Sequence, residues 1–214
     1  MAEEQEAVVE EQEAVVKETG AVKKGLGDAG AIVKEGIVAS LKGVSEIEAE
    51  IVSLARNTVA NTLQATGDVA TESLNVTTSV IKGAVQATEE MGSGVIMGTK
   101  SVAKGIIMGV SDVGGDLVTA AGQTTRGAVQ TASEVGLDVA MVARRTVDGI
   151  LEATTEVGGN VEKVAEKAVV GAIEAAGNIG KTATIAVTDI LVGVAGGMKD
   201  VLNAVLPKPK EKEE

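Results

Sequence analysis

Residues 127–136 read GAVQTASEVG and residues 149–158 read GILEATTEVG, and this repeat at a spacing of 22 decides the fold. Related segments begin at Gly83 (GAVQATEEMG), Gly105 (GIIMGVSDVG) and Gly171 (GAIEAAGNIG), and Gly193 continues the spacing. A fixed period of this length indicates a repeat architecture. Each unit divides into two 11-residue halves, because apolar and polar positions recur every 11 residues from about residue 20 to residue 206.

An 11-residue period equals three helical turns of about 3.67 residues, so it predicts an α-helix. The apolar columns would cover roughly half of its circumference, more than the seam of a two-stranded coiled coil. We therefore predict an all-α protein with a long, nearly continuous amphipathic helix built from 22-residue double units. Unbroken, it would be roughly 280 Å long. Folding into helical hairpins at the Gly-Gly pairs 114–115 and 158–159, or side-by-side packing in a bundle or filament, are the alternatives.

The two ends of the chain differ from the repeat region, which we place at residues 20–206. Residues 1–19 form an acidic arm in which EEQEAVV occurs twice, at 3–9 and 10–16. Residues 207–214 form a charged tail that begins with Pro207, and proline ends a helix because it lacks the backbone N–H.

Glycine recurs on the flank of the predicted helix. Each glycine costs an isolated helix up to about 1 kcal/mol against alanine, so this helix should form only when it packs. A missing side chain also lets a neighbouring backbone approach closely. The predicted close-packing glycines are Gly83, Gly105, Gly127, Gly149, Gly171 and Gly193.

Charges of opposite sign gather on the two edges of the polar face. The basic edge contains Lys34, Arg56, Lys82, Lys100, Lys104, Arg126, Arg144 and Lys181. The acidic edge contains Glu46, Asp68, Glu90, Asp112, Asp116, Glu134, Asp138, Glu156 and Asp189. A solvated face with local salt bridges would explain this bias. We favour helices of neighbouring copies lying side by side, with the basic edge of one against the acidic edge of the next.

Composition excludes several classes of function. The chain has no Cys and no His, which removes disulfides and the usual zinc ligands, and its net charge of −12 argues against binding nucleic acid. Residues 175–182 (AAGNIGKT) and 25–30 (GLGDAG) match relaxed nucleotide-binding patterns, but no strand precedes either in the predicted structure. We therefore predict no enzyme activity, no catalytic residue, no cofactor and no metal.

The sequence gives two indications of location. The acidic N-terminus lacks the basic start of a secretory signal, which predicts a cytoplasmic protein. The longest run without a charged residue is Asn57 to Gly67, too short to cross a bilayer.

Two families share features of this repeat. GTKSVAKGIIMGV (98–110) and GGNVEKVAEKAVVGAIEAAG (158–177) resemble, in period and composition, the 11-residue repeats of synucleins and perilipins. That resemblance implies a coat on membranes or neutral-lipid droplets. Thr66, Thr77, Thr88 and Thr99, spaced by 11, resemble the α-helical antifreeze proteins of fish, which implies ice binding as a remote alternative. The charged edges and acidic balance favour a non-enzymatic structural protein whose partner is itself, assembled into a bundle, tube or filament.

Overall fold

A computed structural model of the chain describes residue 31 and residues 44–66, 69–91 and 96–194. These residues are almost entirely helical and contain no strand. The helices are α2 (Val44–Thr66), α3 (Val69–Met91), α4 (Ile96–Asp112), α5 (Leu117–Glu134), α6 (Val139–Glu156), α7 (Val161–Ile179) and α8 (Lys181–Val194).

The predicted near-continuous helix is wrong for this part of the chain, because a tight turn interrupts it in every 22-residue unit from α4 to α7. Gly114, Gly136 and Gly158 have φ of 70°, 75° and 72°, a left-handed conformation that costs glycine little. The N–H of Gly114 donates to Ser111 O and that of Gly115 to Val110 O, the hydrogen-bond pattern of a Schellman motif.

The residue two places after each turn glycine caps the next helix. Asp116, Asp138 and Asn160 are the N-caps of α5, α6 and α7, and their side chains accept hydrogen bonds from backbone N–H groups of the first turn. For example, Asp138 Oδ1 lies 3.0 Å from Met141 N. The four residues between consecutive helices from α4 to α7 therefore contain both a turn glycine and an N-cap. They fold the 11-residue repeat into helical hairpins, which is the alternative that the Gly-Gly pairs suggested.

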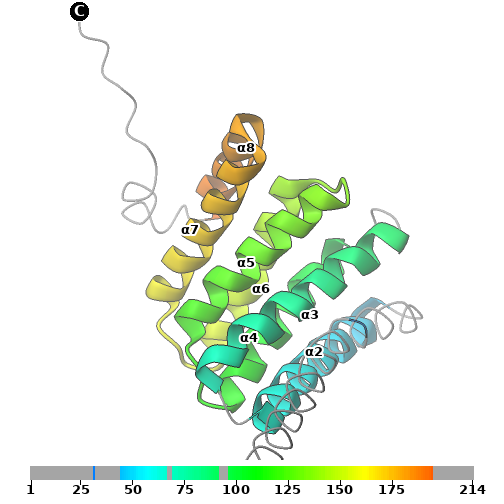
Figure 1. Ribbon diagram of the computed structural model, residues 1–214, viewed down its shortest axis with the longest axis vertical. Coiled ribbons are helices and arrows are strands. Elements are labelled where there is room, and N and C mark those ends of the chain that lie inside the picture. The colour runs from blue at the N-terminus through cyan, green and yellow to red at the C-terminus, as the bar shows by residue number, and fades with distance from the viewer. Residues whose placement is uncertain (1–30, 32–43, 67–68, 92–95, 195–214) are drawn as a thin grey trace, which may run out of the picture.

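The helices stack in two layers. Each helix packs against the helix two places along the chain, so α2, α4, α6 and α8 form one layer and α3, α5 and α7 form the other. Figure 1 shows α3, α5 and α7 side by side, with α4 and α6 behind them. Consecutive helices also touch across the layers, which closes one elongated core. This arrangement is a helical solenoid in which each unit contacts its neighbours.

The core uses the apolar columns of the repeat. Leu63, Val85, Ile107 and Val129 belong to one column and are fully buried. All buried apolar residues in the described helices are Ala, Val, Ile or Leu. Since no large ring fills space between the layers, the helices must come close together to exclude water.

Candidate functional site

The predicted glycines lie where helices of one layer meet. A Cβ on Gly105 would be 2.5 Å from Val52 O of α2, and one on Gly149 would be 2.1 Å from Lys100 O of α4. In the other layer, Gly127 faces the Ile81 side chain at 3.0 Å and Gly171 faces Gly122 O at 2.4 Å. At Gly105, Gly149 and Gly171 the backbone of the neighbouring helix thus lies directly against the glycine, whereas at Gly127 a side chain of α3 fills the space. Gly83 is buried, and the packing of Gly193 lies outside the described residues.

Basic-edge side chains contact carboxylates of neighbouring helices inside one chain. Some of these carboxylates belong to the predicted acidic edge, whereas Glu152 and Glu174 are partners that the sequence pattern did not identify. Arg56 of α2 pairs with Asp112 of α4 at 2.5 Å, and Lys82 of α3 lies 3.5 Å from Glu134 of α5. Further along, Arg126 of α5 pairs with Glu174 of α7. In each case a basic side chain of one helix contacts an acidic side chain of the next helix in the same layer. We call this series the ion-pair ladder.

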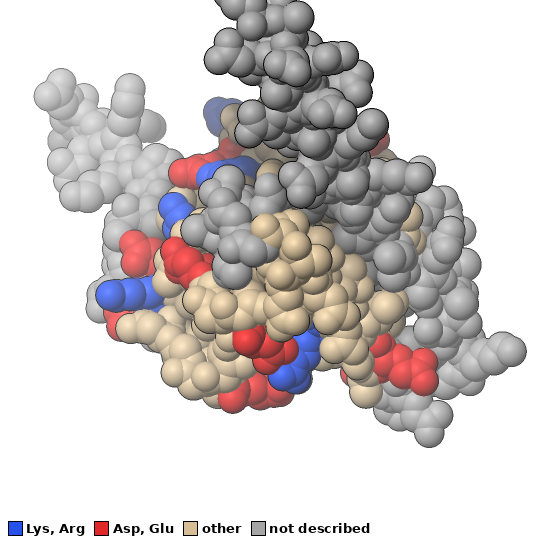
Figure 2. All heavy atoms as spheres, turned by 60° about the horizontal axis from the view of Figure 1, so that its bottom comes forward, with Lys and Arg blue, Asp and Glu red and all other residues tan. Residues whose placement is uncertain are grey.

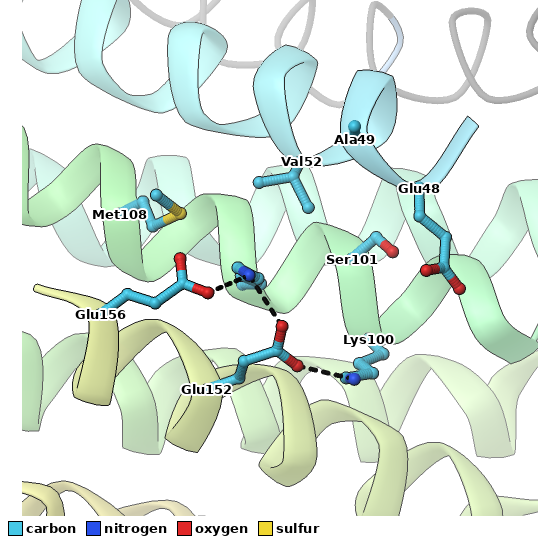
Figure 3. Close-up of a pocket in the computed structure, with 9 residues that line it drawn as sticks. Glu48, Ala49, Val52, Lys100, Ser101, Met108, Glu152 and Glu156 are labelled. Atoms are coloured by element: carbon cyan, nitrogen blue, oxygen red, sulfur yellow. Dashed lines mark hydrogen bonds and ion pairs between the residues drawn. The ribbon is translucent and has the colours of Figure 1, made fainter. Parts of the chain in front are cut away.

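The ladder is densest between α4 and α6. Lys100 contacts Glu152 at 2.6 Å, while Lys104 donates to Glu152 at 2.7 Å and also to Glu156. Figure 3 shows Lys100 of α4 and Glu152 and Glu156 of α6 in the space between the two helices. Partial burial by itself would lower the pKa of Lys104, but hydrogen bonds to Glu152 and Glu156 outweigh it, so the pKa is raised. Hydrogen bonds from Lys100 and Lys104 lower the pKa of Glu152. Both shifts favour the charged forms of Lys104 and Glu152.

A hollow of about 370 Å³ lies over α4 between α2 and α6. Its lining consists of Glu48, Ala49, Val52, Lys100, Ser101, Lys104, Met108, Glu152 and Glu156. Because the pKa of Lys104 is raised and that of Glu152 is lowered, neither group is suited to exchange protons near neutral pH. No group of Asp or Glu residues in the described helices is arranged to hold a metal ion. The hollow is thus a space between helices in which the ion pairs of the ladder lie.

The remaining edge residues have other positions. Arg144 lies 3.9 Å from Asp148 of its own helix. Asp116 and Asp138, predicted for the acidic edge, serve as N-caps instead, and the Thr119 hydroxyl is the main cause of the lowered pKa of Asp116. Lys34 and Asp68, and the side chains of Glu46 and Glu90, lie outside the described residues.

Helix α8 lacks charged residues at two positions that are charged in α4 and α6. A shift of 44 residues relates α4, α6 and α8, and it aligns Lys104 with Asp148 and Val192. The same shift aligns Lys100 with Arg144 and Thr188. Positions that are charged in α4 and α6 are therefore uncharged in α8.

Exposed apolar side chains gather at this end of the solenoid. Within the described part of the chain, the large hydrophobic residues that remain exposed are Ile185 at 52%, Val192 at 43% and Ile179 at 38%. Ile185 and Val192 lie seven residues, or two turns, apart on one side of α8. Lys181 and Asp189 are exposed beside them and form no ion pair with any described residue. We call Lys181, Ile185, Asp189 and Val192 the α8 stripe; Ile179, the last residue of α7, lies next to it in the chain.

One face of the molecule carries a mixture of charges. On the face shown in Figure 2, acidic and basic side chains lie beside each other in small groups separated by uncharged surface. Such a mixed surface is typical of one that stays in water.

The antifreeze interpretation fails on burial. Of the threonine column, Thr77 and Thr99 are fully buried and Thr66 is half-buried, so the column forms no exposed surface for ice; the side chain of Thr88 lies outside the described residues. Thr154, which continues the column 55 residues after Thr99, donates its hydroxyl to Ile150 O at 2.7 Å, whereas the hydroxyls of Thr77 and Thr99 have no partner among the described residues. A small side chain at a crowded helix contact explains this column.

Comparison with known proteins supports the fold. No family model and no curated protein matches the chain. The crystal structure of a de novo designed helical repeat protein, DHR7, is similar, with a TM-score of 0.51 and 18% sequence identity. The similarity covers 81% of this chain and 98% of the designed one. The chain therefore has a helical repeat fold. None of the described helices is long and apolar enough to cross a membrane.

Proposed function

We propose that this protein is a non-enzymatic structural protein that self-assembles through the α8 stripe. The observation that carries the proposal is the concentration of exposed apolar residues there, with Ile185 the most exposed of them. Terminal units of solenoids usually present a polar outer face, because an apolar one promotes association. A stripe of the opposite character is typical of a surface that binds something.

Association through the α8 stripe differs from the edge-to-edge contact between copies that we expect from the sequence. Five residues of the predicted basic edge, Arg56, Lys82, Lys100, Lys104 and Arg126, already contact a carboxylate of the next helix in the same layer, so their charges are partly compensated within the chain. Lys181 and Asp189 are the edge residues left for an intermolecular contact among those whose side chains are described in α8.

The test compares two double variants that add the same charge. I185E/V192E places two carboxylates on the stripe, and Q130E/T155E places two on exposed positions of α5 and α6. We expect sedimentation velocity to show concentration-dependent association for the wild type and Q130E/T155E, and its loss in I185E/V192E. All three should keep the same helical circular dichroism. A wild type that stays monomeric up to millimolar concentration would contradict the proposal.

A lipid-surface coat is the competing function, and the fold makes a distinct prediction for it. The apolar columns are buried, with Leu63, Ile107 and Ile150 fully inaccessible, so a coat would have to open the layers. Mixing the protein with a neutral-lipid emulsion tests this directly. Protection of backbone amides in α4 and α6 should be unchanged for a self-assembling solenoid and lost for a coat that unfolds onto oil.

A further inference from the structure

The charges of the α8 stripe are placed symmetrically about its most exposed residue. Lys181 lies four residues before Ile185 and Asp189 lies four residues after it. Each charge is therefore about 6 Å from Ile185 along the helix axis, in opposite directions. Thr182 and Thr188, three residues to either side, continue the symmetry.

We propose that two copies of the chain pair α8 against α8 in antiparallel orientation, about a two-fold axis that passes beside Ile185. This inference rests on the proposed self-assembly and specifies its geometry. In this arrangement Ile185 contacts Ile185 of the second copy, and Lys181 of each copy faces Asp189 of the other. The partner is thus a second copy of this chain, joined by a closed, self-complementary contact.

Charge distinguishes this arrangement from parallel pairing. Two parallel helices in register would place Lys181 opposite Lys181 and Asp189 opposite Asp189, and like charges at close range repel. Antiparallel pairing makes two ion pairs instead. It also brings the carboxylate of the second copy near the first turn of α8, where the helix dipole disfavours Lys181 alone.

Val192 extends the apolar part of the same contact. It lies seven residues, or two turns, after Ile185 on the same side of α8, whereas Ile179 is the last residue of α7 and lies outside this helix. A contact along a 14-residue helix about 21 Å long is small. We therefore expect a weak dimer, with a dissociation constant on the order of 10–100 μM.

A single introduced thiol tests the axis, because the chain has no cysteine of its own. In I185C the two thiols would face each other across the two-fold axis, within the short range that a disulfide requires. Oxidation of full-length I185C with diamide should give covalent dimer at least about tenfold faster than oxidation of T155C, which carries its thiol at an exposed site of α6. Equal rates would overturn the two-fold arrangement.

Charge reversal tests the ion pairs independently of any crosslink. K181D and D189K should each weaken the dimer about three- to tenfold in sedimentation equilibrium, since each leaves two like-charged contacts. The double variant K181D/D189K should restore wild-type affinity, because it exchanges the two charges of each ion pair.

The outcomes separate this inference from the proposed function. Association without I185C crosslinking and without rescue, or filaments in electron microscopy, would overturn the α8 dimer while self-assembly stands. A monomer at every concentration would overturn both.

Discussion

Replacing Gly149 and Gly177 by alanine should change the stability of the protein in opposite directions. Both residues lie within helices, where alanine is favoured over glycine by up to about 1 kcal/mol. At Gly177 a Cβ would meet nothing within 4 Å, so G177A should realise most of this gain. At Gly149 the new Cβ would lie 2.1 Å from Lys100 O and 3.2 Å from Lys104 N.

The clash in G149A is with backbone, so no side-chain rotation relieves it. Helices α4 and α6 would have to separate by about 1 Å, at a cost of about 2–3 kcal/mol, the upper part of the usual range for overpacking. After the gain in helix propensity, the net loss should be about 1–2 kcal/mol. Separation would also lengthen the contacts from Lys100 and Lys104 to Glu152.

Thermal and urea unfolding followed by circular dichroism measure both variants. We expect the midpoint temperature to fall by about 3–8 °C in G149A and to rise by about 1–4 °C in G177A. If G149A were as stable as G177A, the close approach of α4 and α6 would not exist, and the account of the glycine column would be refuted.

Three further variants test other parts of the structure. D138A removes the side chain that caps α6, and the free energy of unfolding should fall by about 1 kcal/mol in urea titrations, whereas D138N, which retains the acceptor, should stay near wild type. G136A places a side chain at φ 75° with nothing within 4 Å, so strain of about 1–2 kcal/mol should destabilise it without any clash. The lowered pKa of Glu152 makes its contribution complete above the unfolded value of about 4.3 and lost as pH falls through the folded pKa. Urea midpoints measured from pH 6 down to pH 3 should therefore fall more for the wild type than for E152Q; parallel curves would exclude a stabilising role for this carboxylate.

Periodicity identified the helices but could not locate their ends. A turn repeated every 22 residues leaves the 11-residue pattern in phase, so a continuous helix and a solenoid give the same columns. The distinguishing signal was local: a glycine followed two residues later by an N-capping side chain, as in Gly114–Asp116, Gly136–Asp138 and Gly158–Asn160. Two of those capping residues, Asp116 and Asp138, fall near the acidic column, so the charge pattern predicts them as edge residues and not as caps.

Charge segregation indicated which surfaces meet but not whether they belong to one chain. Arg56 and Asp112 lie 56 residues apart, and only the turns between them show that both sit in one layer. The special character of α8 appears only after alignment at 44 residues, because Val192 and Thr188 are ordinary residues until they are compared with Lys104 and Lys100. Alignment at 22 residues does not reveal this difference, since it compares helices of one layer with helices of the other.

The stacking of each helix on the helix two places along the chain also determines how such a protein can change in length. A second copy of α5 inserted between α5 and α6 would move α6 to the opposite layer and place Gly149 against α5 instead of Lys100 of α4. Copies of both α4 and α5 inserted at the same point would keep α6 in its layer and place Gly149 against the copy of Lys100. Engineered variants of this protein should therefore be lengthened or shortened by pairs of helices.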